Sequence, residues 1–367
     1  ATGNAAIDAY KTLKPNTKWY LAGYLHTFAA LIIVGYTSVI YAWIIKYIAG
    51  AVAGDFVGLT SEGIQSYFDT FNANKPMVFL FFLINFLLND AVIILGVQKG
   101  IERVSKILIP ILFVIMIVII IFGLRLPGAK DGLTFLFKPD FSKFSMSSVI
   151  TCLGQAFFAL GLAMLGSMVF GSYIKEKDEN IFKDSSVICL ALVFAGILSG
   201  LMILPIVFAT GLTPGEGVGL TFLTLPLAFN VVPFGRILSV LFYFGFYIAA
   251  FTSSVGVLEA IVGQFMERFK LERIKALILA SVIILGIAAL SVFYEPAFAF
   301  IDNVESNYIL VIGCLLIALF SARAWKMENL LEAANIKSPF VRTWMNVSIK
   351  YISPIVIVII FFSQFIK

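Results

Sequence analysis

The stretch Ile107–Leu124 reads ILIPILFVIMIVIIIFGL and carries no charged side chain. A helix of about 20 apolar residues crosses a membrane, because it satisfies its own backbone hydrogen bonds and presents apolar side chains to lipid. Similar stretches recur along the chain between short polar segments. We therefore predict about nine membrane-spanning helices, at Tyr20–Ile48, Met77–Val97, Ile107–Leu124, Ser147–Tyr173, Ser186–Thr210, Ile237–Met266, Ala276–Phe293, Phe298–Phe320 and Ser348–Phe365.

The composition agrees with an all-α, polytopic membrane helix bundle that forms one transmembrane domain over residues 1–367. Hydrophobic residues make up 60% of the chain and charged residues 13%, whereas soluble proteins carry about 25% charged residues. The net charge of +5 is small and scattered, which argues against a nucleic-acid partner. No nucleophile, base and metal ligands occur in an enzyme motif, and the only histidine is His26. We expect lipid around the protein and no covalent chemistry.

The basic residues of the loops predict the orientation. Lys and Arg are concentrated in alternate loops, for example Lys99, Arg103 and Lys106 in one and Arg268 and Lys270 in another. Basic loops stay on the cytoplasmic side of a membrane. We therefore expect the first residue of the chain in the cytoplasm and the last residue outside, in a cytoplasmic (inner) membrane.

One predicted span is unusually rich in small residues. Gly154–Tyr173 reads GQAFFALGLAMLGSMVFGSY. Small residues let neighbouring membrane helices approach closely, and composition alone favours this interpretation. The alternative is a helix interrupted around Gly161–Gly166. Non-helical backbone is tolerated at membrane depth where protein or a cavity satisfies it, and its free groups can bind a zwitterion.

A second polar feature lies in the span Ile237–Met266. On a helix, the carbonyl of Ala249 lies one turn from the hydroxyls of Thr252 and Ser253, so three neutral oxygens share one surface. Hard cations bind such oxygens. The alternative is that both hydroxyls bond back to carbonyls of the preceding turn, as is common in membrane helices.

Ionisable side chains inside predicted spans also need a role, because they are costly in lipid. Asp90 lies near Asn85 and Asn89, where a proton or cation site and an interhelical hydrogen-bond cluster are both open. Glu259 lies beyond the hydroxyl pair, towards the cytoplasm. A further segment, 211–236, is apolar and proline-containing, and we expect it to pack onto the bundle as a structured cap or a lid.

Several stretches, taken in order, resemble the bacterial branch of the neurotransmitter:sodium symporter family. They are Glu102-Arg103-Val104-Ser105-Lys106, Leu126-Pro127-Gly128-Ala129, Lys138-Pro139-Asp140-Phe141, Gly154-Gln155-Ala156-Phe157-Phe158, Gly171-Ser172-Tyr173, Gly219-Leu220-Thr221-Phe222, Thr252-Ser253-Ser254 and Ser306-Asn307-Tyr308. The resemblance implies a LeuT-like fold that lacks the first two helices, so that the nine spans are helices three to eleven.

The resemblance also implies residue roles. A sodium site would use the Ala249 carbonyl with the Thr252 and Ser253 hydroxyls. A third-helix tyrosine would contact the substrate carboxylate, with the register open between Tyr36 and Thr37. The rest of the substrate pocket would comprise Phe158, Ala159, Gly161, Met164 and Val257. The outer-gate carboxylate would be Asp302 or Glu305.

Two departures from the family pattern concern ions. Ala159 stands where a hydroxyl often binds the first sodium, and Ile188–Leu198 reads ICLALVFAGIL without any Asn, Asp, Ser or Thr. We therefore expect one Na⁺ site, at Ala249, Thr252 and Ser253. We expect the family's other Na⁺ site and its chloride site to be degraded in this chain. The resemblance implies a sodium-coupled transporter of an amino acid or related amine. The alternative is a membrane scaffold protein that keeps the fold without transport.

Overall fold

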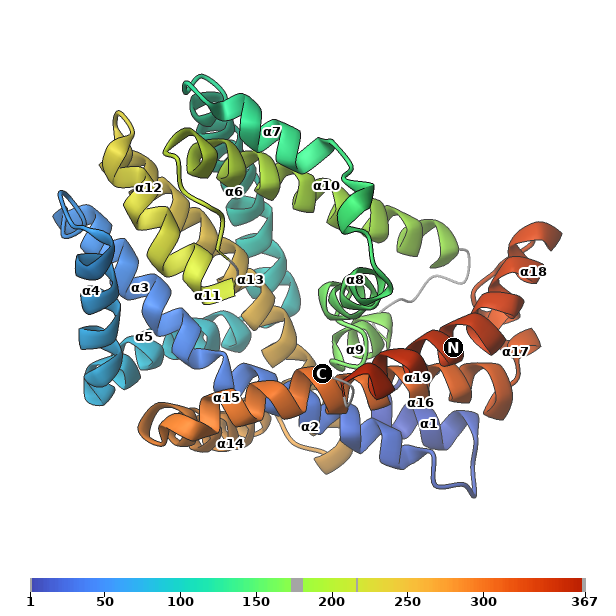
Figure 1. Cartoon of the computed structure of the whole chain (residues 1–367). Helices are drawn as coiled ribbons and strands as arrows, with labels where there is room; N and C mark the ends of the chain where they lie inside the picture. Colours follow the sequence, from blue (N-terminus) through green and yellow to red (C-terminus); the bar gives the residue numbers. More distant parts are fainter. Residues whose placement is uncertain (1, 173–180, 216, 365–367) are drawn as a thin grey trace. The chain divides into compact units, whose positions relative to one another are not determined.

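The computed structural model describes residues 2–172, 181–215 and 217–364. Every regular element in these ranges is a helix, and no strand occurs in them (Figure 1). The chain divides into two compact units, each assembled from segments that are distant in sequence. Unit 1 comprises Ala1–Tyr36, Phe144–Leu192 and Gly256–Lys367, and unit 2 comprises Thr37–Lys143 and Val193–Val255.

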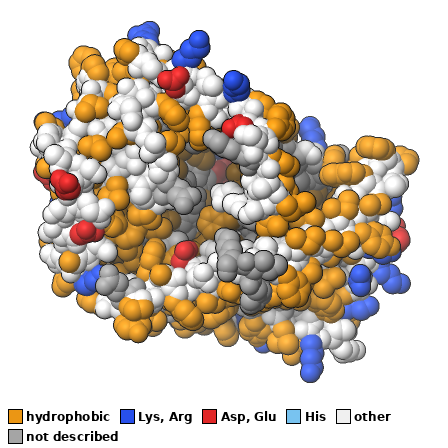
Figure 2. All heavy atoms as spheres, viewed as in Figure 1, with side chains coloured by type: hydrophobic (Ala, Val, Ile, Leu, Met, Phe, Trp, Pro, Cys, Tyr) orange, Lys and Arg blue, Asp and Glu red, His pale blue; other side chains and the backbone are white. Residues whose placement is uncertain are grey.

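Eight helices in the described ranges are long and apolar enough to cross a membrane. They are Tyr20–Ala53, Lys75–Ile94, Gly100–Gly123, Ile181–Ala209, Gly235–Phe269, Arg273–Phe293, Pro296–Ala324 and Pro339–Ser363. Hydrophobic side chains cover much of the face shown in Figure 2, as expected for a protein surrounded by lipid. The fold class predicted from the sequence is confirmed, and eight of the predicted spans correspond to these helices.

The remaining predicted span, Ser147–Tyr173, is not one helix. It consists of α8 (Met146–Ala159) and α9 (Gly166–Ser172), with non-helical backbone between them (Figure 1). The interpretation favoured by composition, a continuous helix with small residues at a close helix contact, is therefore wrong. The interrupted helix is the alternative that the structure contains.

Unit 1 is arranged around α2 (Tyr20–Tyr36), which packs against α1 (Ala6–Leu13), α14 (Arg273–Phe293) and α16 (Leu310–Leu319). Helix α16 also packs against α19 (Ser353–Ser363), which contacts α8. The other elements of unit 1 are α9, the start of α10 (Ile181–Ala209), the end of α13 (Gly235–Phe269), α15 (Glu295–Val304), η4 (Glu305–Ile309), η5 (Phe320–Ala324), α17 (Met327–Ala333), α18 (Pro339–Val347) and η6 (Ser348–Ile352).

Unit 2 contains a closely packed pair of helices, α3 (Ser38–Ala53) and α5 (Lys75–Ile94), with α4 (Ser61–Ala73) against α5. Its other elements are η1 (Val97–Glu102), α6 (Arg103–Gly123), α7 (Ala129–Phe137), η2 (Phe141–Lys143), the end of α10, α11 (Gly217–Gly219), η3 (Leu220–Thr224), α12 (Leu225–Val231) and the start of α13.

The segment formed by α11, η3 and α12 packs onto unit 2, as its apolar sequence predicts. Phe222, Leu225 and Phe229 are buried. The Phe222 ring packs against the rings of Tyr47 in α3 and Tyr243 in α13, at centroid distances of 4.9 and 6.3 Å. The segment is therefore a structured cap whose core is aromatic.

Candidate substrate and ion sites

The interruption at 160–165 is produced by three residues in the left-handed region. Gly161, Ala163 and Leu165 have φ angles of 61°, 67° and 65°. Glycine adopts this conformation freely, but residues with a Cβ lose roughly 1–2 kcal/mol each. Such strain persists where surrounding structure enforces it, and it is concentrated at binding sites. The interruption is therefore an enforced feature of the fold.

The backbone of the interruption is sheltered within unit 1. Ala163, Met164 and Leu165 are buried. The carbonyl oxygen of Ala163 has left the helical ladder and lies 3.2 Å from Nδ1 of His26 in α2. This arrangement meets the condition for non-helical backbone at membrane depth, which is a partner inside the protein.

Four residues with predicted substrate roles lie at this interruption. Phe158 and Ala159 end α8, and Gly161 and Met164 belong to the non-helical segment. A fifth, Val257, lies half-buried on α13 next to Gly256, which faces the Phe170 ring of α9. Phe158, Ala159, Gly161 and Met164 thus lie close together because they are near neighbours in the sequence. Val257 lies on α13, which passes α9.

A cavity of about 600 Å³ opens beside α8 in unit 1. This volume lies within the usual range for small-molecule sites. Phe158 lines it, together with the Asp302 carboxylate and the Ser306 hydroxyl. The full lining is Met146, Ser147, Ile150, Thr151, Gly154, Gln155, Phe158, Asp302, Ser306, Asn307, Leu310, Val311, Ile360, Ser363 and Gln364. The cavity combines apolar walls with hydroxyl and amide groups and one carboxylate, a chemistry suited to an amine with an apolar side chain.

The predicted gate carboxylates lie where α15 continues into the π-helical turn η4. Asp302 is exposed, whereas Glu305 is fully buried, with its Oε2 3.4 Å from the Ser306 hydroxyl. Glu305 is thus not an exposed residue of the membrane interface, because its side chain points from the π-helical turn into unit 1. Single π-helical turns inside α-helices occur frequently at functional sites.

Tyr36 joins the same cluster from the end of α2. Its side chain is buried, and its ring packs edge-on against Phe298 at 5.9 Å. Its hydroxyl interacts with the side chains of Asp302 and Ser306. The structure therefore groups a predicted substrate residue with both predicted gate residues.

The predicted sodium ligands lie together on α13 in unit 2. Thr252 Oγ1 donates to the carbonyls of Ile248 and Ala249 at 3.0 and 3.1 Å, and Ser253 Oγ donates to the Ala249 carbonyl at 3.0 Å. The back-bonding alternative is thus observed, and it also gathers the three predicted oxygens. Both hydroxyl oxygens keep a lone pair after these bonds, and rotation of the hydroxyl groups frees the Ala249 carbonyl, so the donor set fits Na⁺.

Metal sites of another kind do not compete with this one. Within residues 2–172, 181–215 and 217–364, no three His, Cys, Asp or Glu side chains gather as around a metal ion. The oxygens of Ala249, Thr252 and Ser253 are neutral carbonyl and hydroxyl oxygens. Such neutral ligands suit a monovalent hard ion better than a transition metal.

The polar residues of α5 form an interhelical hydrogen-bond cluster with α13. The Ser254 hydroxyl donates to Oδ1 of Asn89 at 3.0 Å, and the Tyr247 hydroxyl donates to Oδ1 of Asn85 at 3.1 Å. Both asparagines are buried. Of the two alternatives that the sequence left open, the hydrogen-bond cluster therefore accounts for the two asparagines.

The buried carboxylate of Glu259 has a structural partner. Arg273 of α14 donates to both of its oxygens, at 2.7 and 2.9 Å. Planar, two-point pairing of this kind is the strongest form of ion pair between side chains. Glu259 thus serves to join the end of α13 to the start of α14.

Sequence reasoning missed the partners of the interruption. His26 was visible as the only histidine inside an apolar span, and a polar residue at membrane depth signals a buried partner. Its contact with residue 163 bridges two segments that are distant in sequence, which periodicity cannot reveal. The Tyr10 hydroxyl lies 3.2 Å from His26 Nε2, and no sequence pattern indicated this contact.

Comparison with known proteins identifies the family. The profile of the sodium:neurotransmitter symporter family matches residues 67–367. This chain belongs to that family. A sodium-dependent transporter of Bacillus subtilis, YhdH, is 34% identical over 98% of this chain and 82% of its own length. A sodium-dependent transporter of Haemophilus influenzae is 30% identical over 99% of this chain and 82% of its own length.

A solved structure supports the same assignment. The crystal structure of MhsT in complex with L-phenylalanine superposes with a TM-score of 0.88 at 32% identity, covering 99% of this chain and 85% of MhsT. The chain is thus a multi-pass membrane protein of a sodium-dependent transporter family with a LeuT-like fold. This family consists of transporters, in agreement with the absence of an enzyme motif from the sequence.

Proposed function

We propose that this protein is a symporter that couples Na⁺ entry to the uptake of an amino acid or related amine across the cytoplasmic membrane. The interruption at 160–165 carries the proposal. In a family of transporters, a helix that is broken at membrane depth turns half-helix ends and non-helical backbone towards a charged ligand. In the proposed orientation, the first residue faces the cytoplasm and the last faces outside.

The substrate site lies at the end of α8. The Phe158 and Met164 side chains supply apolar surface, Gly161 leaves open space beside the backbone, and Ala159 and Val257 complete the proposed wall. Half-helix ends carry partial charges that complement a zwitterion. The L-phenylalanine bound to MhsT supports an amino acid with a hydrophobic side chain.

The outer gate is the cluster of Tyr36, Asp302 and Glu305. Its carboxylate at Asp302 faces the cavity, so it can meet a substrate amine before the substrate reaches the interruption. The buried Glu305 and the Tyr36 hydroxyl fix this side of the cavity from within unit 1. We assign a contact with the substrate carboxylate to the Tyr36 hydroxyl.

One Na⁺ binds at Ala249, Thr252 and Ser253. Both hydroxyl oxygens lie within hydrogen-bonding distance of the Ala249 carbonyl oxygen, so one cation can contact all three after the hydroxyl groups rotate. The apolar stretch Ile188–Leu198 offers no side-chain ligand for a second Na⁺ or for chloride. We therefore propose coupling to a single Na⁺ without chloride.

The test is uptake of radiolabelled amino acids by full-length protein in liposomes, with an inward Na⁺ gradient and with K⁺ in its place. We expect uptake of a hydrophobic amino acid only with Na⁺. Binding without uptake would favour the scaffold alternative, and neither binding nor uptake with any amino acid or amine would refute the proposal.

Alanine at both Thr252 and Ser253 should raise the Na⁺ concentration needed for half-maximal uptake by about tenfold, because two of the ligands are lost. Ser291→Ala is the matched control, since the Ser291 hydroxyl also donates to a carbonyl four residues earlier, in α14. A Na⁺ requirement that changes equally in both variants would contradict the ion site.

A further inference from the structure

The single histidine of the chain touches the interruption directly. His26 is fully buried in α2, and its Nδ1 lies 3.2 Å from the Ala163 carbonyl oxygen. Ala163 is itself in the left-handed region, so its carbonyl leaves the direction of the helix axis. The imidazole supplies the partner that the helical ladder would otherwise provide.

The neighbours of the imidazole fix its tautomer. A carbonyl oxygen only accepts hydrogen bonds, so Nδ1 carries the proton and donates to Ala163. The other ring nitrogen, Nε2, is then an acceptor, and the Tyr10 hydroxyl donates to it at 3.2 Å. The result is a directional chain of hydrogen bonds from α1 through α2 to the interruption.

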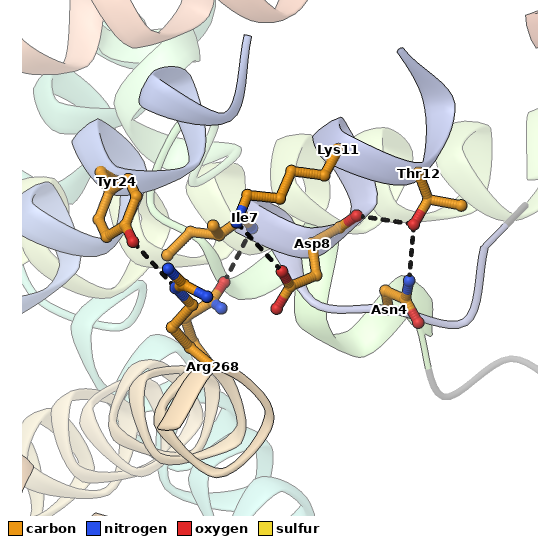
Figure 3. Close-up of polar contacts among 8 residues, drawn as sticks. Asn4, Ile7, Asp8, Lys11, Thr12, Tyr24 and Arg268 are labelled. Atoms are coloured by element: carbon orange, nitrogen blue, oxygen red, sulfur yellow. Dashed lines mark hydrogen bonds and ion pairs between the residues drawn. The ribbon is translucent and has the colours of Figure 1, made fainter. Parts of the chain in front are cut away.

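Helix α1 is held in place at its first turn. The backbone N–H groups of Ala5 and Ile7, which have no partners within the helix, donate to the side chains of Glu267 and Gln264 in α13 at 2.7 and 3.2 Å. Next to them, Arg268 of α13 donates to the Tyr24 hydroxyl of α2 at 2.9 Å (Figure 3). Tyr10 therefore projects from a helix that is anchored to α13.

The fit around the histidine leaves no spare room. A Cβ added at Gly313 of α16 would lie 2.6 Å from the Ala163 Cβ and 3.2 Å from His26 Nδ1. Side chains cannot approach this closely without displacement. The interruption is thus enclosed by the histidine on one element and by a bare glycine on another.

We propose that His26 is a positioning residue for the substrate segment, holding the Ala163 carbonyl so that residues 160–165 keep their binding conformation, with Tyr10 orienting the imidazole. This inference rests on the proposed function for its effect on substrate, but its effect on the segment itself is independent of it. A histidine that only filled space would be replaceable by any side chain of similar size.

The first experiment measures amide hydrogen exchange of peptides covering 158–168 in the full-length protein. The amides of Gly161, Met164 and Gly166 report on the segment, because each donates to a carbonyl within it or to the last turn of α8. His26→Leu removes the donor, whereas His26→Asn keeps an amide nitrogen near the position of Nδ1. We expect exchange about tenfold faster in His26→Leu, as loss of one buried hydrogen bond implies, and near wild type in His26→Asn.

Equal exchange in the Leu and Asn variants would overturn the proposal. If the Leu variant cannot be purified folded, Tyr10→Phe provides the test, since it keeps the imidazole and removes only its orienting partner. Faster exchange confined to 158–168 is then expected, and unchanged exchange would overturn the proposal in that case too.

The second experiment measures binding of L-phenylalanine in Na⁺ to the same variants. We expect about tenfold weaker affinity in His26→Leu and recovery in His26→Asn. Equal affinity of the Leu variant and the wild type would overturn the positioning role. If the wild type binds neither L-phenylalanine nor another amino acid, the proposed function fails, while hydrogen exchange still decides the role of His26.

Discussion

Replacing Arg273 by methionine should destabilise the protein strongly, because it removes the two charge-assisted hydrogen bonds that Arg273 donates to the buried carboxylate of Glu259. Glu259 is fully buried, and the Arg273 side chain is only 25% exposed. Two charges about 4 Å apart interact by about 4 kcal/mol at an effective dielectric constant near 20. The partial exposure of Arg273 reduces this value. Removal of one partner of a buried pair costs about 3 kcal/mol, which is the loss of unfolding free energy that we expect for Arg273→Met.

The double variant Glu259→Leu with Arg273→Met separates the charge effect from packing. It removes both charges of the pair together, so we expect it to recover most of the lost stability. Lys275→Met is the surface control, since the Lys275–Glu272 pair is well exposed and should contribute nothing measurable.

The assay is equilibrium unfolding in mild detergent, titrated with SDS and followed by tryptophan fluorescence. The reasoning is refuted if Arg273→Met loses less than about 1 kcal/mol, well below the cost expected for removing one partner of a buried pair. It is also refuted if the double variant is less stable than the single variant.

Three further predictions concern transport and topology. Full-length protein should show a Hill coefficient for Na⁺ near one and no chloride dependence, because residues 188–198 offer no polar ligand; a two-ion signature would contradict this. Asp302→Asn should slow uptake while leaving thermal stability unchanged, because its carboxylate is exposed in the cavity; a lowered melting temperature would instead indicate a structural role. In a background without other cysteines, single cysteines at Lys99 and Lys177 should resist an impermeant outside reagent in intact cells, and ready labelling of either would reverse the proposed orientation.

Membrane spans were predictable because the bilayer imposes a length and a composition on every helix that crosses it. The predicted span Ile107–Leu124 corresponds to α6, Arg103–Gly123, and Ala276–Phe293 corresponds to α14, Arg273–Phe293. The errors lie at helix ends, where the charged residues Arg103 and Arg273 belong to helices that hydropathy alone begins several residues later.

The interruption was visible in the sequence only as one of two interpretations. Its glycines are compatible with close packing and with a break, and the deciding residues are Ala163 and Leu165, which do not favour left-handed backbone. Ala163 contacts His26 of α2 and lies against Gly313 of α16, so its conformation depends on tertiary structure. The burial of Glu305 escaped prediction for a similar reason, since a π-helical turn shifts side-chain directions relative to the α-helical period.

The predicted ion ligands gathered as expected because they lie within one helical turn of each other. A site on a single helix is fixed by spacing alone. The hydroxyl group of Tyr36 and the Asp302 carboxylate, by contrast, belong to helices separated by more than 250 residues of sequence. The resemblance to a known family gave each of these residues a separate role, and neither the resemblance nor the local sequence pattern predicted that the two side chains meet.

The cap of unit 2, formed by α11, η3 and α12, is held by the hydroxyl groups of two tyrosines. Tyr47 donates to the Phe222 carbonyl at 2.9 Å, and Tyr243 donates to the Thr221 carbonyl at 2.7 Å. Detaching the cap would break both bonds, at about 1 kcal/mol each, and expose the Phe222 ring, at about 3 kcal/mol. An opening free energy of about 5 kcal/mol corresponds to roughly one molecule in several thousand. A cap held this firmly would travel with α3 and α13 as one rigid piece during transport, and a disulfide locking it to either helix should leave the turnover rate intact.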